Sequence, residues 1–300
     1  MTSKSQLGKV IRRIFPESRI RSISLRRGFF NENWIIGMDS RKVVVRVFDE
    51  PWKAKKEEFL YGLIRKKTDV PVPEVYYCDV SRKILSKPYL ALSLCDGRIA
   101  KDAKELEKRT IMQMGSYLAK IHSVRMKSFG WIIGDAIRPS FSKWKDFMDY
   151  DFGNKLAVIR KHGDLGKEID DIRKTYNCYQ TLFDVREKPC LLHKDFHLQN
   201  IFIKGDKVSG VIDWEWALGG HNELDISKSV LFMFEKNPGL EKEFIKGYLR
   251  HGSLKGFEKR KSAYRFVNIV GNLSLAFQLG NRKAAIENKA RLAEMLKQMP

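Results

Sequence analysis

Residues 193–200 read His-Lys-Asp-Phe-His-Leu-Gln-Asn, and the run Val-Ile-Asp-Trp-Glu follows at 211–215. These two segments contain Asp195, Asn200 and Asp213, a set of side chains suited to phosphoryl transfer. In that reaction one carboxylate orients a hydroxyl nucleophile, while an amide and a second carboxylate hold the metal ion that bridges the phosphates. We therefore predict that Asp195 is the catalytic base and that Asn200 and Asp213 bind Mg²⁺.

The segments around these residues predict how they come together. Apolar residues lead into the first motif, and two further apolar runs follow it at 201–203 and 208–212. Two short strands joined at Gly205-Asp206 would form a hairpin. Such a hairpin places Asn200 and Asp213 near one another at its open end. The alternative is a polar turn between buried segments, without a catalytic role.

The chain before residue 97 is rich in β-forming residues. We predict strands at 20–25, 34–38, 42–48, 75–78 and 89–94, and a helix at 54–66. In the third strand Arg46 shares a face with Lys42 and Val44. In the helix, Glu57 lies on the apolar face with Leu60 and Ile64, whereas Glu58 points about a hundred degrees away.

Asp96-Gly97 marks a change in pattern. Beyond it, apart from the hairpin, the sequence predicts helices at about 104–124, 141–162, 167–185, 225–235, 240–250, 257–279 and 282–298. We therefore predict an α+β fold with a small antiparallel β-rich lobe at 1–96 and a larger, mainly helical lobe at 97–300. The hinge between them falls near 92–97, and the larger lobe carries the catalytic hairpin.

Composition restricts the possible partners and the compartment. The chain has 57 Lys and Arg against 36 Asp and Glu, a net charge of +21, which favours anions such as ATP, phosphorylated metabolites, nucleic acid or an anionic membrane surface. The four cysteines show no metal-ligand or close disulfide spacing, so we expect reduced thiols in a cytoplasmic protein. We expect neither a secretory segment nor a membrane span. The oligomeric state stays open.

The combined pattern resembles the aminoglycoside phosphotransferase and choline kinase family, which has a protein-kinase-like fold, over nearly the whole chain. His193, Asp195, His197 and Asn200 match its His-x-Asp-x-His-x-x-Asn motif, and 212–215 match its Ile-Asp-Trp-Glu motif. Weaker matches are Gly28-Phe29-Phe30-Asn31 with its nucleotide loop, 70–73 with its Val-Pro-x-Pro segment and 118–122 with its Leu-Ala-x-Leu-His helix.

The resemblance implies a nucleotide site between the lobes, with ATP and Mg²⁺ as cofactors and GTP left open. It places Arg46 where kinases have a phosphate-binding Lys, paired with a helix carboxylate. The helical pattern favours Glu57 as that partner, and Glu58 stays open. The alternative is an ordinary exposed strand Arg and a solvated helix Glu. We expect the phosphates under the turn from Gly28 to Asn31, and the adenine against the hinge at Ser93 and Cys95.

Other polar and aromatic residues of these motifs are expected to be structural. His193 is predicted to be hydrogen-bonded within the catalytic loop, and Asp225 to begin a helix. His122 is predicted to be packed within its helix, and Trp214 to lie in the core. For His197, support of the loop and contact with substrate both stay open.

The predicted function is phosphorylation of a hydroxyl group on a small molecule such as an antibiotic, sugar, amino alcohol or related metabolite. A protein serine kinase fits less well, because Gly-x-Gly-x-x-Gly, Asp-Phe-Gly and Ala-Pro-Glu are missing. The +21 charge disfavours a polycationic aminoglycoside, although 213–225 hold four carboxylates and no Lys or Arg. The competing class is a catalytically inactive kinase-like protein that binds nucleic acid through its basic excess.

Overall fold

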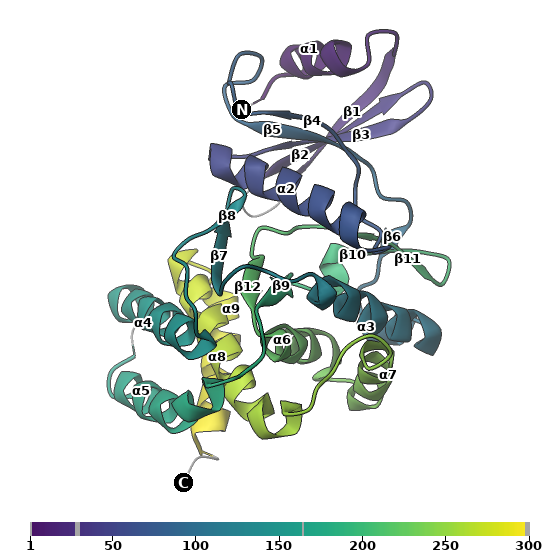
Figure 1. Cartoon of the computed structure of the whole chain (residues 1–300). Helices are drawn as coiled ribbons and strands as arrows, with labels where there is room; N and C mark the ends of the chain where they lie inside the picture. Colours follow the sequence, from purple (N-terminus) through teal and green to yellow (C-terminus); the bar gives the residue numbers. More distant parts are fainter. Residues whose placement is uncertain (1, 28–30, 164, 298–300) are drawn as a thin grey trace.

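The computed structural model describes residues 2–27, 31–163 and 165–297, which form two lobes (Figure 1). The smaller lobe contains α1 (Lys4–Ile14), β1 (Ile20–Arg27), β2 (Glu32–Met38), β3 (Lys42–Val47), α2 (Pro51–Lys67), β4 (Val75–Asp79) and β5 (Tyr89–Ser93). The larger lobe is mainly helical. The predicted α+β, two-lobed architecture is confirmed, whereas the boundary between residues 96 and 97 stays a prediction.

The sheet of the smaller lobe is antiparallel, in the order β1-β2-β3-β5-β4. Successive side chains of each strand point to opposite faces of the sheet, so an apolar layer lies on each face. Val43 and Val45 pack against α1, while Leu90 and Leu92 belong to the layer that contains α2. Figure 1 shows the sheet between these two helices, with α2 on the side of the larger lobe. Arg46, which alternates with Val45, therefore faces α2.

Helix α2 begins three residues earlier than the sequence predicted. Pro51 and Trp52 were expected only to end the third strand, but Pro51 occupies the first turn of α2. A proline is well suited to this position, because its fixed φ matches the helix and the first amides need no intrahelical acceptor. The helix thereby gains Lys53 in its first turn, and both Lys53 and Lys56 contact the larger lobe.

The larger lobe is mainly helical, and its other helices lie on both sides of one central helix, α6 (Asn222–Phe234). Its elements are β6 (Arg98–Ile99), the 3-10 turn Ala103–Glu105, α3 (Lys108–Ser123), β7 (Gly130–Ile133), β8 (Ala136–Ile137), α4 (Trp144–His162), α5 (Glu168–Tyr179), the 3-10 turn Gln180–Phe183, β9 (Cys190–Leu192), the 3-10 turn Leu198–Asn200, β10 (Ile201–Lys204), β11 (Lys207–Val211), β12 (Leu218–Gly220), α6 (Asn222–Phe234), α7 (Pro238–Tyr248), α8 (Phe257–Gln278) and α9 (Arg282–Lys297). Helix α6 supplies Ile226 to the apolar cluster of α3 and α7, and Leu224 to that of α4 and α8. None of the helices in the described part of the chain meets the length and hydropathy needed to cross a bilayer.

Several short strands of this lobe were missed by the sequence prediction. β7, β8, β9 and β12 form a four-stranded sheet in the order β8-β7-β12-β9, and β6 pairs with β10. Each has only two to four residues, too few to show an alternating pattern. The predicted hairpin itself is confirmed: Lys204 pairs with Lys207 across a turn in which Gly205 has a φ of 61°.

A neutral histidine lies immediately before α6. The indole N–H of Trp144 donates to the Tyr264 hydroxyl at 2.9 Å, so that hydroxyl is free to donate to His221 Nδ1 at 2.8 Å. Burial, followed by the nearby charges of Arg260 and His122, lowers the pKa of His221 to about 3. Protonated His221 would no longer accept this hydrogen bond.

Acidification should therefore destabilise the protein through His221. The unfolded chain binds this proton near pH 6.5 and the native state only near pH 3, so stability falls as the pH drops through that interval. For one such group, the free energy of unfolding changes by up to about 1.4 kcal/mol per pH unit. We expect the difference in unfolding free energy between pH 6.5 and 4.5 to be about 2 kcal/mol smaller in His221→Asn, measured by urea denaturation. Identical pH dependence in the two proteins would contradict the assignment.

Candidate active site

The catalytic loop follows β9 and is held from behind by a buried carboxylate. Asp225 in the first turn of α6 is fully buried and accepts hydrogen bonds from the backbone N–H groups of His193 (2.8 Å) and Lys194 (3.0 Å). Its Oδ2 also lies 3.1 Å from Nε2 of His122, whose other ring nitrogen is 2.9 Å from the Tyr248 hydroxyl. Despite its burial, these contacts hold the pKa of Asp225 below its usual value. Asp225 is structural, as predicted, and it positions the loop.

His193 connects the loop to the segment after β11. Its Nδ1 accepts from the backbone N–H of Asp195 at 3.2 Å, so its Nε2–H donates to the carbonyl of Ile212 at 3.1 Å. The ring is fully buried, which lowers its pKa, and its centroid lies 4.5 Å from that of buried Trp214. A neutral, doubly hydrogen-bonded imidazole supports the loop and does not carry protons, as the sequence predicted.

Asp195 lies at the centre of three polar contacts. Its Oδ2 accepts from the Asn200 amide at 3.0 Å and lies 3.2 Å from Nε2 of His197, while its Oδ1 accepts from Lys228 at 2.9 Å. Burial alone would raise its pKa, but Lys228 and His197 outweigh that effect and hold the pKa well below its usual value. Asp195 is therefore a carboxylate at neutral pH, able to accept a hydrogen bond from a hydroxyl group.

The hairpin brings Asn200 and Asp213 together as predicted. The backbone N–H of Ile212 donates to the carbonyl of Asn200 at 3.0 Å. The Asn200 side-chain amide N–H group bonds to Asp195, which leaves the side-chain carbonyl oxygen as the atom that could bind a metal ion. Asp213 has a φ of 66°, a left-handed conformation that costs a non-glycine residue about 1–3 kcal/mol.

This pair of oxygen ligands fits Mg²⁺ rather than a metal held by protein alone. The described residues contain no cluster of three or more His, Cys, Asp or Glu side chains that could hold a metal ion. Mg²⁺ usually takes one or two protein oxygens and completes its octahedron with phosphate oxygens and water. The Asn200 carbonyl and the Asp213 carboxylate have the chemistry for such a site.

Arg46 reaches this site from the smaller lobe. Its Nη2 lies 2.8 Å from Asp213 Oδ1 and 3.0 Å from Glu57 Oε1, and both carboxylates raise its pKa against the opposing effect of burial. Glu57 is 1% exposed, and burial raises its pKa to about 7 even beside Arg46. Glu58 contacts Lys55 instead at 2.8 Å. The structure thus pairs Arg46 with Glu57, as the helical pattern predicted.

Two lysines of α2 make a second connection between the lobes that the sequence did not reveal. Lys53 Nζ lies 2.8 Å from Glu215 Oε1, and Lys56 Nζ donates to the backbone carbonyl of Glu215 at 2.6 Å. Burial lowers the pKa of Lys56 to about 7. Lys53 precedes the predicted start of the helix and Lys56 lies within it, but no pattern placed either residue beside the Asp-Trp-Glu segment.

The residues expected around the nucleotide are only partly described. Gly28, Phe29 and Phe30 lie outside the described residues, and Asn31 is buried just before β2. Ser93 exchanges hydrogen bonds with the backbone of Glu74, through both its own N–H and its hydroxyl, at 2.9 Å. The Cys95 thiol lies against Gly210 of β11, and burial raises its pKa to about 12. The adenine site at Ser93 and Cys95 stays a prediction.

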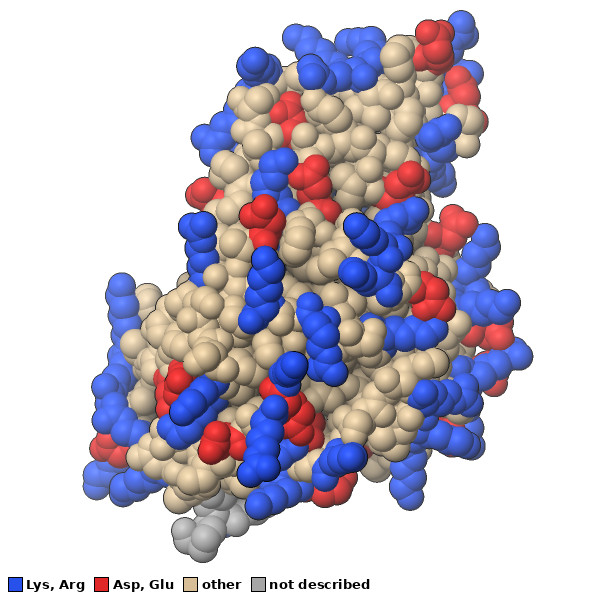
Figure 2. Space-filling model, in the orientation of Figure 1, with Lys and Arg blue, Asp and Glu red and all other residues tan. Residues whose placement is uncertain are grey.

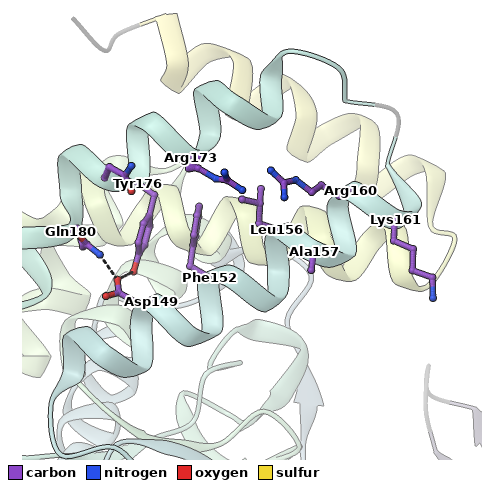
Figure 3. A pocket seen from close by; sticks show the side chains of 11 residues that line it. Asp149, Phe152, Leu156, Ala157, Arg160, Lys161, Arg173, Tyr176 and Gln180 are labelled. Atoms are coloured by element: carbon purple, nitrogen blue, oxygen red, sulfur yellow. Dashed lines mark hydrogen bonds between the residues drawn. The ribbon is translucent and has the colours of Figure 1, made fainter.

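A surface groove of about 610 Å³ lies between α4 and α5 (Figure 3). The Phe152 and Tyr176 rings stack in it with centroids 3.8 Å apart, and Asp149 accepts from the Tyr176 hydroxyl at 2.8 Å. Figure 3 shows Arg160 and Arg173 extending toward each other across it. Its lining residues include none of the predicted site residues, so the groove is separate from the catalytic loop.

Comparison with known proteins identifies the family. The family model described as "Phosphotransferase enzyme family" (APH) matches residues 23–261. The chain belongs to this family. It is therefore a phosphotransferase enzyme, and the predicted resemblance is confirmed.

Solved structures share the whole fold of this phosphotransferase. Aminoglycoside phosphotransferase APH(4)-Ia has a TM-score of 0.76 at 17% identity and covers 99% of this chain and 100% of its own. A thermostable mutant of that enzyme, solved as a ternary complex with AMP-PNP and hygromycin B, has a TM-score of 0.75 at 18% identity, over 98% of each chain. A "putative fructosamine-3-kinase" from Thermobifida fusca has a TM-score of 0.73 at 18% identity, covering 97% of this chain and 98% of its own.

A curated plant protein contains a related segment. It is described as "Probable acyl-CoA dehydrogenase IBR3" of Arabidopsis thaliana and is 23% identical over 190 residues. The match includes 59% of this chain but only 22% of the plant protein. The present chain therefore corresponds to a minor part of that relative.

Proposed function

We propose that this phosphotransferase transfers the γ-phosphoryl group of Mg-ATP to a hydroxyl group of a small molecule. The observation that supports this most directly is the convergence of Asp195, Asn200 and Asp213 in the larger lobe with Arg46 of the smaller lobe. Phosphoryl transfer depends mainly on positioning and charge neutralisation, and these four side chains have the chemistry for both.

Each side chain has a distinct role in this proposal. The Asp195 carboxylate accepts a hydrogen bond from the acceptor hydroxyl and orients its oxygen. Asn200 and Asp213 would hold Mg²⁺, which when bound neutralises charge on the phosphate oxygens. Arg46 is held beside Asp213 by Glu57 and neutralises phosphate charge from the smaller lobe.

The remaining nucleotide contacts complete the proposal. In this proposal the segment from Gly28 to Asn31, of which the structure describes Asn31, binds the phosphates, and the adenine contacts the hinge at Ser93 and Cys95. This assignment rests on the family motif and on the position of the hinge after β5. The use of nucleotide is in keeping with the AMP-PNP named for the related APH(4)-Ia complex.

The face of the molecule seen in Figure 2 gives no support to the competing nucleic-acid function. Figure 2 shows Lys and Arg over both lobes of the visible face, with Asp and Glu among them. A nucleic-acid site usually gathers its basic side chains on one face or along one stripe. The complete phosphoryl-transfer set favours the enzyme.

Binding of Mg-ATP should be visible as thermal stabilisation. At about 100 times the Kd, a ligand adds about 2.7 kcal/mol, which corresponds to a Tm increase of about 5 °C for a chain of this size. We expect EDTA to remove most of this increase, and Asp213→Asn to behave with magnesium as the wild type does without it. Asp135→Asn, which changes an exposed turn residue, is the matched control. A Tm that Mg-ATP leaves unchanged would reject the proposed function.

A further inference from the structure

Lys228 on α6 lies beside Asp195, the carboxylate proposed to orient the acceptor hydroxyl. Its side chain is 12% exposed, and its ammonium group contacts Oδ1 of Asp195 at 2.9 Å. Oδ2 of the same carboxylate already has two polar neighbours, the Asn200 amide and the His197 ring. Lys228 is the hydrogen-bond partner that the structure records for Oδ1 among the described residues. Since a carboxylate oxygen has two lone pairs, Oδ1 is the atom with room for a hydroxyl donor.

This geometry puts the acceptor beside an ammonium group. Two donors on one carboxylate oxygen lie about 4–5 Å apart. A hydroxyl on Oδ1 therefore brings the substituents of its neighbouring carbon atoms within reach of Lys228 Nζ. The charge on those substituents then decides whether Lys228 attracts or repels the acceptor.

The carboxylates that might attract a cationic acceptor are engaged elsewhere. Asp213 contacts Arg46, Glu215 contacts Lys53 at 2.8 Å, Glu223 contacts Arg260 at 2.7 Å, and Asp225 binds the catalytic loop. The four carboxylates of 213–225 left open an acidic patch that could attract a cation. In the structure, contacts within the protein engage all four of them. Asp195 itself is paired with Lys228.

The exposed face of α6 continues this basic character away from Asp195. Residues 228, 232 and 235 follow one another at helical spacing. Phe232 is 48% exposed, lies 5.5 Å from Lys228 Nζ and is 5.4 Å from the His197 ring. Beyond it, Glu235 contacts both Arg265 and Arg291 at 2.7 Å, so two guanidinium groups outweigh one carboxylate.

A second lysine, Lys194, lies close to Lys228 and is buried. Buried Lys194 has its pKa lowered well below the usual value, first by burial and then by the charges of Lys228 and Lys155. Lys155 is paired with Asp151. Lys194 donates its own hydrogen bond to the side-chain carbonyl of Asn268 at 2.7 Å. Lys194 is thus shifted toward its neutral form, and the positive charge beside Asp195 is that of Lys228.

We infer that Lys228 selects an acceptor with an anionic group, a carboxylate or a phosphate, close to the hydroxyl that is phosphorylated. Phe232 provides an apolar contact for the carbon skeleton of the same molecule. The inference rests on the proposed function, because it assigns the acceptor side of the same site. It excludes polycationic amines as good acceptors.

The test compares acceptors that differ in charge alone. Matched triplets of one skeleton, such as glucuronate, glucose and glucosamine, are assayed for phosphoryl transfer from Mg-ATP with the wild type, Lys228→Gln and Lys228→Arg. We expect the wild type to favour the anionic member. Lys228→Gln should lower kcat/KM for that member by about 10–100-fold, mainly through KM, with a much smaller effect on the neutral member. Lys228→Arg should keep the order of preference.

Lys236→Gln removes the same charge from an exposed position just after α6, so it controls for net charge and should leave the preference intact. A wild-type preference for cationic members would overturn the inference. So would an equal loss for every acceptor in Lys228→Gln, which would place Lys228 at the transferred phosphate instead. Failure to phosphorylate any anionic compound, in protein that Mg-ATP stabilises, would overturn it as well. Absence of that stabilisation would refute the proposed function instead.

Discussion

Asp195→Asn is expected to lower kcat by about 10²–10⁴-fold while Mg-ATP binds nearly as in the wild type. Asparagine has almost the shape of aspartate and keeps an oxygen for Lys228, but it loses the negative charge that the acceptor hydroxyl needs. Its new N–H group would also face the Asn200 amide donor, which now donates to the carboxylate. Chemistry should therefore suffer more than binding.

Steady-state turnover at saturating acceptor measures the effect, and calorimetric titration with Mg-ATP measures nucleotide binding. Asp206→Asn provides the matched control, because it makes the same change at the tip of the hairpin, where the Asp206 carboxylate forms an ion pair with Arg109. Asp206→Asn should retain both turnover and Mg-ATP binding. Turnover of Asp195→Asn within a few-fold of the wild type would remove Asp195 from the chemistry.

Asp225→Ala should cause the largest loss of stability, about 3–5 kcal/mol in the free energy of unfolding. The substitution leaves the amides of His193 and Lys194 and the ring of His122 without their buried acceptor. Each unsatisfied buried group costs about 1–3 kcal/mol. The catalytic loop also loses the carboxylate that fixes its backbone, so activity should decline in the fraction that stays folded.

Urea denaturation at pH 7 provides the measurement, with Asp135→Ala as the control for removing an exposed carboxylate. Asp225→Asn is an intermediate case. It keeps the volume of the side chain but replaces one acceptor oxygen with an NH2 group that faces N–H donors. We expect its stability to fall between those of the wild type and Asp225→Ala. A loss below about 1 kcal/mol in Asp225→Ala would show that water or another group replaces the carboxylate.

The sequence predicted the parts of the site that local rules govern. Asp195 and Asn200 lie in one contiguous motif, and the turn at Gly205 sets the hairpin that returns the chain to Asp213. Helical spacing alone distinguished Glu57 from Glu58 as the residue that faces Arg46. In each case the decisive geometry is set by a few neighbouring residues along the chain.

The groups that surround this set could not be predicted, because tertiary packing brings them in. Lys228 comes from α6, more than thirty residues along the chain from Asp195, and no motif marks it. The contact of Lys53 with Glu215 joins two lobes. Strands such as β7 and β12 are too short to show their pairing in the sequence. A single sequence contains no signal for such long-range contacts.

The two residues in left-handed backbone conformations next to the catalytic groups have a consequence for protein engineering. Lys194, with a φ of 66°, precedes Asp195, and Asp213 has the same φ. L-residues rarely adopt this conformation, and the surrounding contacts, Asp225 and Asn268 above all, must overcome its cost. The chain thus loses some thermodynamic stability at the residues that hold the proposed reactive groups. Variants selected only for heat resistance would tend to relax these positions first, and the trade-off would appear as lost turnover in a better-folded protein.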